Sequence, residues 1–132
     1  MKRSLTLQPL SREHHTALAL AKACERAVQS GDEEKINKAC QRVIQVFSDE
    51  LEPHFQLEEK SFLPLLSNAE NRQLEERTLA EHEQLRGLLD DLRQGNMKSL
   101  DSFGKCLVAH VRFEEKELFP ALEILLPTAQ QS

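Results

Sequence analysis

The sequence predicts an all-α protein, an up-down-up-down antiparallel four-helix bundle. Apolar residues recur every three or four positions along four stretches, and nowhere do several residues alternate between apolar and polar as in a strand. The composition agrees, because 30% of the 132 residues are charged and Leu, Glu, Gln, Lys and Ala are frequent. The chain length suits one domain, residues 1–132, with a short polar lead (1–10) and a polar tail (127–132).

The first helix is expected to follow Ser11, whose side chain suits a helix N-cap, with Glu13 in the first turn. It should end near Gln29, because Ser30 and Gly31 provide a stop signal. Its apolar residues fall on one arc: Leu10, Ala17, Leu18, Ala21, Cys24 and Val28.

Asp32 can cap the second helix, in which Pro53 should produce a kink just before His54. This helix should fade after Pro64, and residues 67–71 should form the crossing to the next. The inward stripe reads Ile36, Cys40, Val43, Phe47, Leu51, His54, Glu58, Phe62 and Leu65.

The last two helices are separated by Gly95 and Asn96. The inward stripe of the third helix is Leu74, Thr78, His82, Leu85, Leu89 and Leu92. That of the fourth is Leu100, Phe103, Leu107, His110, Glu114, Leu118, Ala121 and Leu125, before Pro127.

One motif occurs twice. His54-Phe55-Gln56-Leu57-Glu58-Glu59 is followed by Pro64, and His110-Val111-Arg112-Phe113-Glu114-Glu115 is followed by Pro120 at the same spacing. Residues four apart lie about one helical turn apart, so each copy presents an imidazole and a carboxylate on one face.

Helix geometry predicts whether the inward histidines of different helices lie at the same height along the bundle axis. At 1.5 Å per residue, His82 and His110 each lie roughly 20 Å from the turn that joins their helices. The first two helices match less well, by about 8 Å between His14 and His54, which a longer loop or the Pro53 kink would absorb.

Six inward side chains therefore form a candidate metal site: His14, His54, Glu58, His82, His110 and Glu114. A buried carboxylate without a partner costs several kcal/mol, and two divalent cations would remove this cost. Mixed nitrogen and oxygen ligation without thiolate indicates iron, manganese or zinc, and six ligands favour a dinuclear centre. His15 points about 100° away from the first helix's apolar arc, so His14 is preferred and His15 is the alternative.

Other functional classes find little support. The net charge is −5 and the basic residues are scattered, which disfavours nucleic-acid binding. No apolar run is long enough for a membrane span or a secretion signal, and three unpaired-looking cysteines (Cys24, Cys40 and Cys106) suit a reducing cytoplasm. We expect these cysteines to be packed core thiols, although Cys106, one turn before His110, could be redox-active.

These motifs resemble the hemerythrin-like (HHE cation-binding) family over residues 10–126. The resemblance rests on four motifs: Glu13-His14, His54-Phe55-x-x-Glu58-Glu59 with Pro64, Glu81-His82-Glu83-x-Leu85, and His110-x-x-x-Glu114-Glu115 with Phe119-Pro120. The resemblance implies a four-helix bundle that holds two iron ions in a non-haem, oxo- or hydroxo-bridged di-iron centre, with Glu58 and Glu114 as bridging carboxylates. Manganese or zinc is the less favoured metal.

The chain departs from oxygen-carrying hemerythrins at two positions. Arg86 stands where they place a second histidine on the third helix, and Glu115 stands where they place an aspartate. The missing imidazole favours sensing, redox chemistry or iron handling over oxygen storage, with O₂, NO, peroxide or iron itself as the ligand. The alternative is a di-iron oxidase or peroxidase, or an iron donor in cluster repair; the absence of Tyr disfavours a tyrosyl-radical route. A protein partner or a homodimer stays open.

Overall fold

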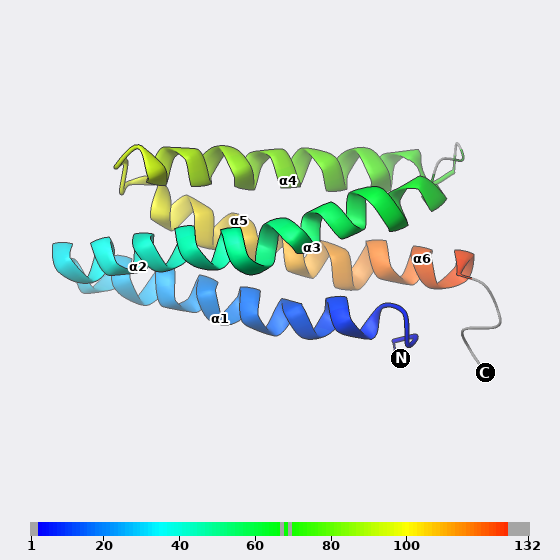
Figure 1. Cartoon of the computed structure of the whole chain (residues 1–132), viewed down its shortest axis with the longest axis horizontal. Coiled ribbons are helices and arrows are strands. Elements are labelled where there is room, and N and C mark those ends of the chain that lie inside the picture. Colours follow the sequence, from blue (N-terminus) through cyan, green and yellow to red (C-terminus); the bar gives the residue numbers. More distant parts are fainter. Residues whose placement is uncertain (1–2, 67, 69, 127–132) are drawn as a thin grey trace.

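The computed structural model describes residues 3–66, 68 and 70–126. These residues form four helical rods that lie side by side along the long axis, with no strand among them, which confirms the all-α prediction of four helices (Figure 1). The first rod is α1 (Gln8–Ser30) and the third is α4 (Arg72–Arg93). The second consists of α2 (Glu33–Val46), the π-helical turn η1 (Phe47–Leu51), α3 (Glu52–Leu57), the π-helical turn η2 (Glu58–Phe62) and the 3₁₀ turn η3 (Leu63–Leu66). The fourth consists of α5 (Ser99–Phe113), the π-helical turn η4 (Glu114–Leu118) and α6 (Phe119–Leu125).

The turn between α1 and α2 follows the sequence signals. Gly31 adopts the left-handed region with φ 65°, which a glycine enters without the steric cost of a Cβ. The Asp32 side chain then accepts hydrogen bonds from the backbone N–H groups of Glu34 and Lys35. Both expected helix boundaries are confirmed here.

The prediction of Ser11 as the N-cap of α1 is wrong, because the helix begins at Gln8 and its N-cap position is Leu7. Pro9 lies in the first turn, where its fixed φ and missing N–H fit a helix start. Leu7 and Leu10 are buried and anchor this turn, so residues 1–10 are not simply a polar lead. Ser11 lies inside the helix, and its hydroxyl donates to Glu115 Oε2 at 2.9 Å.

The three π-helical turns share one sequence feature: each ends two residues before a proline, namely Pro53, Pro64 and Pro120. A proline lacks the N–H for the bond to the residue four positions earlier, and its ring crowds that carbonyl. The wider turn redirects the preceding hydrogen bonds to residues five positions apart. The second rod changes direction near α3, where Pro53 predicts a kink (Figure 1).

A π-helical turn contains one extra residue, which shifts the inward stripe by one position beyond η2 and η4, whereas His54 and Glu58 keep their predicted positions beyond η1. After η2, Leu66 is buried, whereas the predicted Leu65 is 40% exposed. After η4, Leu122 and Leu126 are buried in place of Ala121 and Leu125, which only pack against the core from its edge. Leu65, Ala121 and Leu125 were predicted from an uninterrupted helical period. The extra residue of a π-helical turn explains why the next residue is buried in place of each of them.

The predicted arc of α1 also contains one error. Leu18 is exposed, and Leu20 is buried instead. Leu20 lies three residues after Ala17 on the same face, whereas Leu18 lies about 100° away from it. Leu10, Ala17, Ala21 and Cys24 are buried as predicted, whereas Val28 is only partly buried and its neighbour Ala27 is buried.

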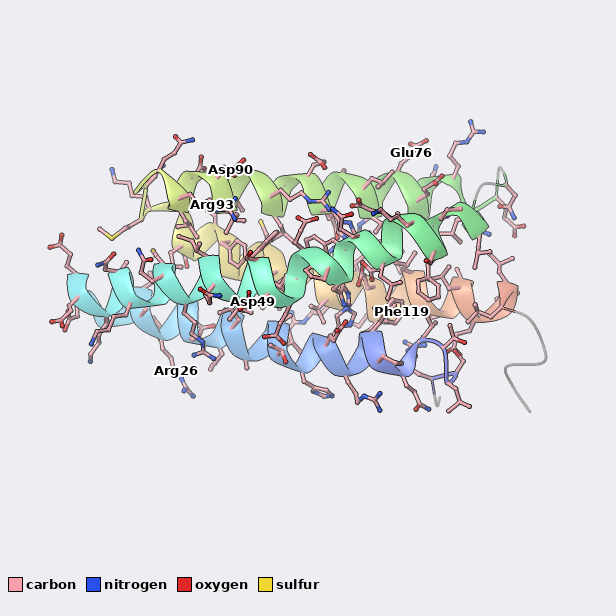
Figure 2. The ribbon with its side chains drawn as sticks, viewed as in Figure 1. Arg26, Asp49, Glu76, Asp90, Arg93 and Phe119 are labelled. Atoms are coloured by element: carbon pink, nitrogen blue, oxygen red, sulfur yellow. The ribbon has the colours of Figure 1, made fainter. Side chains whose placement is uncertain are left out.

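The core consists of two apolar clusters. The larger one includes Phe47, Phe55 and Phe103, and the smaller one includes Leu66 and Phe119. Side chains such as Arg26, Asp49, Glu76, Asp90 and Arg93 are exposed around the rods (Figure 2). None of the described helices is long and apolar enough to cross a membrane.

Replacing Gly104 by Leu is expected to destabilise the bundle, because α1 packs closely against α5 at this residue. A Cβ at Gly104 would lie 3.2 Å from Cys24 Cβ and 3.4 Å from the Ala21 carbonyl oxygen. We expect the free energy of unfolding to fall by about 1–3 kcal/mol, measured by urea denaturation. The control is Gly87→Leu on α4, where nothing lies within 4 Å and the better helix former should be neutral or stabilising. Equal losses in both variants would contradict this account of the packing.

Candidate metal centre

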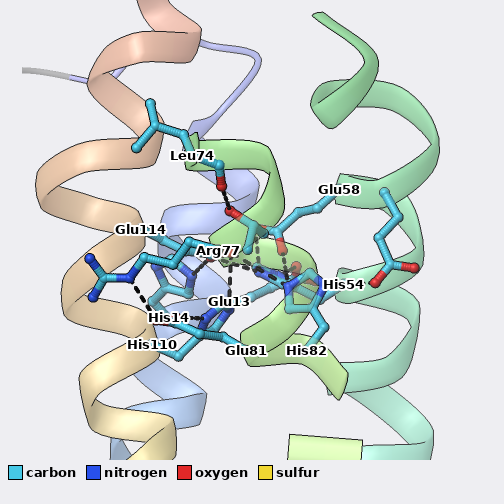
Figure 3. A network of polar contacts seen from close by, with 12 residues as sticks. Glu13, His14, His54, Glu58, Leu74, Arg77, Glu81, His82, His110 and Glu114 are labelled. Carbon is cyan, nitrogen blue, oxygen red and sulfur yellow. Dashed lines mark hydrogen bonds and ion pairs between the residues drawn. The ribbon is translucent and has the colours of Figure 1, made fainter. Parts of the chain in front are cut away.

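The six predicted metal-site residues all lie in one layer, and each is at most 5% exposed. They come from all four rods: His14 from α1, His54 from α3, Glu58 from η2, His82 from α4, His110 from α5 and Glu114 from η4 (Figure 3). The 8 Å mismatch expected for the first two helices is absent, because the ring centres of His14 and His54 are 5.1 Å apart. His15 is exposed and outside the layer, so the structure favours His14 between the two alternatives.

The two glutamates are the first residues of π-helical turns. Glu58 opens η2 and Glu114 opens η4, so the proline that follows each of them shapes the backbone at the carboxylate. π-helical turns inside α-helices are frequent at functional sites. The third such turn, η1, opens with Phe47, so the turn itself follows from the proline and does not depend on a carboxylate.

The four imidazoles direct Nε2 towards these two carboxylates. His14 Nε2 lies 2.8 Å from Glu114 Oε1, and His110 Nε2 lies 3.0 Å from Glu114 Oε2. His54 Nε2 and His82 Nε2 lie 3.1 Å and 3.0 Å from the two oxygens of Glu58. The ligand atoms form two groups, each within 4.8 Å, that share both carboxylates: His14, His54, Glu58 and Glu114, and Glu58, His82, His110 and Glu114.

Short distances in this layer do not amount to a satisfied hydrogen-bond network. Five buried atoms have no hydrogen-bond partner of acceptable geometry among the described residues: both carboxylate oxygens of Glu58, Nε2 of His82, Nε2 of His110 and Oε2 of Glu114. Unpartnered buried carboxylate and imidazole atoms are costly. All five belong to residues of the two groups whose ligand atoms lie within 4.8 Å of one another, and nitrogen and oxygen donors of this kind suit divalent cations, so the residues fit a metal pair.

A second layer of carboxylates holds the histidines from outside. Each imidazole Nδ1 lies within hydrogen-bond distance of one glutamate, which fixes the ring so that Nε2 faces inward. The pairs are His54 with Glu13 at 2.8 Å, His82 with Glu59 at 2.7 Å, His110 with Glu81 at 2.6 Å and His14 with Glu115 at 2.6 Å. We call these four glutamates the outer carboxylates.

The outer carboxylates link the rods in a closed ring. Each rod supplies one glutamate to the histidine of the next rod along the chain, and the fourth supplies Glu115 to His14 of the first. Sequence reasoning placed Glu59 and Glu115 outside the inward stripe but did not assign these pairs. The available signal was adjacency, because every outer carboxylate directly precedes or follows a residue of the inner layer.

Without metal, the inner carboxylates raise the pKa values of the histidines. Burial alone would lower the pKa of His54, but Glu114 and Glu58 outweigh it and raise the pKa to about 11. The same balance raises the pKa of His110 to about 10 and that of His82 to about 9. Burial would raise the pKa of Glu114, but the surrounding imidazoles hold it well below its usual range. The metal-free layer therefore keeps protons that a cation must displace.

A small cavity adjoins the layer on the side of the larger apolar cluster. It measures about 10 Å³, roughly the space of one water molecule. Its apolar walls include Ala17, Leu51, Leu107 and Val111, and its polar walls are Glu13, His14, His54 and His110. Neither inner carboxylate lines it, so the cavity opens on the imidazole side of the layer.

The cysteines lie outside the candidate site. Cys24 and Cys40 are buried in the larger cluster, and burial raises the pKa of the Cys24 thiol to about 12. Cys106 is partly exposed and packs against the same cluster, and burial raises its pKa as well. None of the three belongs to the His/Glu groups, which agrees with packed thiols.

A four-helix protein with a buried His/Glu layer of this kind is a metal-binding protein of the bundle class. Residues 6–123 match the family model described as the hemerythrin HHE cation binding domain, and the chain belongs to that family. Neither the search of curated proteins nor that of solved structures found a match.

Proposed function

We propose that this protein is an up-down-up-down bundle that binds two iron ions and responds to a small ligand at them. One ion would be held by His14 and His54, the other by His82 and His110, and both by Glu58 and Glu114. The observation that carries this proposal is that two four-residue groups share the same two buried carboxylates. A single cation would leave one pair of imidazoles and part of each carboxylate unpartnered.

Iron is the metal that we propose, with manganese and zinc as less favoured alternatives. The donor set contains imidazole and carboxylate and no thiolate, which suits all three metals. A structural zinc site needs four ligands and commonly includes cysteine, whereas six ligands converge here. Iron, once bound, supplies redox chemistry that zinc lacks.

The small cavity beside the layer favours a small ligand: a diatomic molecule, peroxide or water. It has about the volume of one water molecule, and the side chains of Leu51, Leu107 and Val111 exclude bulk solvent from it. An oxidase acting on an organic substrate would need a larger opening at the imidazoles. Sensing, redox chemistry with a small oxidant, or iron handling therefore fits better.

Arg86 supports the reading of a four-histidine centre. Its guanidinium donates to Glu52 at 2.8 Å and to Glu59 at 3.0 Å, so this position supplies no ligand to the layer. Cys24 and Cys40 are both unpaired, which suits the reducing cytoplasm that we propose as the setting.

Metal analysis of protein produced in iron-replete medium tests the proposal. We expect about two irons per chain and, after exposure to air, the charge-transfer absorption of a bridged ferric pair. One zinc per chain in a colourless protein, or no bound metal after reconstitution with Fe²⁺, would overturn the proposal.

A further inference from the structure

The four histidines of the proposed centre are not held equally. We define the brace of a histidine as an arginine that binds the outer carboxylate holding that histidine and that also lies over a phenylalanine ring beside it. Three of the four histidines have a brace, and the inference below rests on the proposed two-ion centre.

The brace of His82 is built from Arg86 and Phe55. Arg86 Nη1 donates to Glu59, which accepts from His82 Nδ1. The same guanidinium lies 5.6 Å from the centre of the Phe55 ring, and Phe55 stacks on His82 with ring centres 3.9 Å apart. His82 is therefore fixed at its edge and across its face.

The brace of His14 repeats this arrangement with Arg3, which precedes α1, and Phe119, from α6. Arg3 pairs with Glu115, which accepts from His14 Nδ1. Arg3 lies 5.5 Å from the centre of the Phe119 ring, and Phe119 stacks on His14 with ring centres 5.2 Å apart.

The brace of His110 uses Arg77 and Phe113. Arg77 Nε donates to Glu81 at 2.9 Å, and Glu81 accepts from His110 Nδ1. The guanidinium lies 4.1 Å from the Phe113 ring centre, and Phe113 lies beside His110 at 6.5 Å.

His54 has no brace among the described residues. Its Nδ1 is held by Glu13, for which the structure shows no arginine partner. The Glu13 side chain is 48% exposed, against 21% for Glu81 in the matching pair. Glu13 is also the outer carboxylate that lines the small cavity.

The internal repeat explains why this brace is missing. Arg77 lies four residues before Glu81, and the residue four before Glu13 is Pro9. Phe113 directly precedes Glu114, and the residue directly before Glu58 is Leu57, which is 46% exposed. The arginine and the phenylalanine that support His110 are thus both absent from the equivalent positions around His54. Phe55 lies 6.1 Å from His54, but the arginine over its ring, Arg86, binds Glu59, so no arginine holds Glu13.

The backbone around His54 is also less regular than the backbone around His110. His54 lies in the six-residue helix α3, directly after Pro53 and between the π-helical turns η1 and η2. His110 lies in the fifteen-residue helix α5, with regular helical turns before it. Breaks in the regular hydrogen-bond ladder favour local opening of a helix.

We infer that His54 is the ligand that opens first, and that the ion held by His14 and His54 is exchanged through this corner while the ion held by His82 and His110 stays. Glu13 acts as a positioning residue, because it holds the His54 ring without a second support. The two ions of one centre therefore differ in lability, although their direct ligands are the same.

Chelator release from the full chain tests this inference. The protein is loaded anaerobically with Fe²⁺ to two ions per chain and mixed with an excess of a ferrous chelator, and release is followed by absorbance. We expect two phases of equal amplitude. Crystals of the form trapped after the fast phase should show, by anomalous scattering, one ion between His82 and His110.

Three variants change the phases separately. Arg77→Gln, which removes the brace of His110, should speed the slow phase several-fold, less than the roughly tenfold or more that follows loss of the direct partner of a metal ligand. Pro9→Arg combined with Leu57→Phe places the missing groups at the equivalent positions and should slow the fast phase. Glu13→Gln should speed the fast phase alone. Arg26→Gln, an exposed arginine on α1, is the control and should change neither phase.

The outcomes separate this inference from the proposed function. Failure of the unaltered protein to bind two ions overturns the proposed function. Binding of two ions that leave in one phase, or loss of the His82 and His110 ion first, overturns the inference alone. A thermal melt of each variant identifies changes in release that come from unfolding.

Discussion

Glu58→Ala is expected to abolish binding of both metal ions. Glu58 belongs to both four-residue groups, so its removal deprives each ion of a ligand at once. The loss should exceed the roughly 100-fold upper range seen when only an outer partner of a ligand is removed. Metal content after reconstitution with Fe²⁺ measures the effect, and retention of one firmly bound ion would contradict the shared role of this carboxylate.

A matched pair of histidines provides the control. His14→Ala removes a buried imidazole of the layer, whereas His15→Ala removes an exposed neighbour. The His14 variant should bind at most one ion, and the His15 variant should bind as the unaltered protein does. Circular dichroism of all three variants confirms that the bundle is folded.

Removal of the metal is expected to lower the melting temperature strongly. At a free metal concentration a thousandfold above the dissociation constant, each ion stabilises the folded state by about 4 kcal/mol. For a chain of this size that corresponds to roughly 15 °C for each ion. Thermal melts of metal-loaded and chelator-treated protein measure the difference, and equal melting temperatures would show that no cation occupies the layer.

This stabilisation should grow with pH. In the metal-free protein the pKa values of His82, His110 and His54 lie at about 9, 10 and 11, above the usual value of about 6.5 for the unfolded chain. Groups whose pKa is raised on folding stabilise the folded state fully below pH 6.5, and this contribution is lost as the pH rises towards the folded-state values. In the metal-loaded form, bound cations replace these protons, so its stability does not fall in the same way as the pH rises.

The metal-free protein should therefore melt at a lower temperature at pH 9 than at pH 6, while the loaded form changes less. Parallel melts across this range check the sign. A metal-free melting temperature that rises with pH would contradict the raised pKa values of the histidines.

Local periodicity predicted the four helices and brought the six inner residues into one layer, because an imidazole and a carboxylate four residues apart must share a helix face. The same reasoning failed at Leu65, Ala121 and Leu125. Each lies beyond a π-helical turn, and an uninterrupted period of 3.6 residues does not include the extra residue. The signal was present in the prolines that follow these turns, but Pro53 predicted only a kink and Pro64 only the end of a helix.

The partners of the histidines could not be derived from single helices. Glu13 and Glu81 each precede a histidine on their own helix but bind the histidine of the neighbouring one. Such pairs depend on the rotation of two helices about their axes, which the stripe of one helix does not determine. The braces are even harder to derive from the sequence, because a brace can join residues from opposite ends of the chain, such as Arg3 and Phe119.

The ring of outer carboxylates has a consequence for how the protein unfolds. Every rod supplies a carboxylate to one neighbour and receives one from the other. The loss of any rod therefore leaves polar groups without partners on both neighbouring rods. Partly unfolded forms that keep three rods in place are thereby disfavoured. Amide hydrogen exchange around the layer should show one common opening energy across all four helices rather than a graded series.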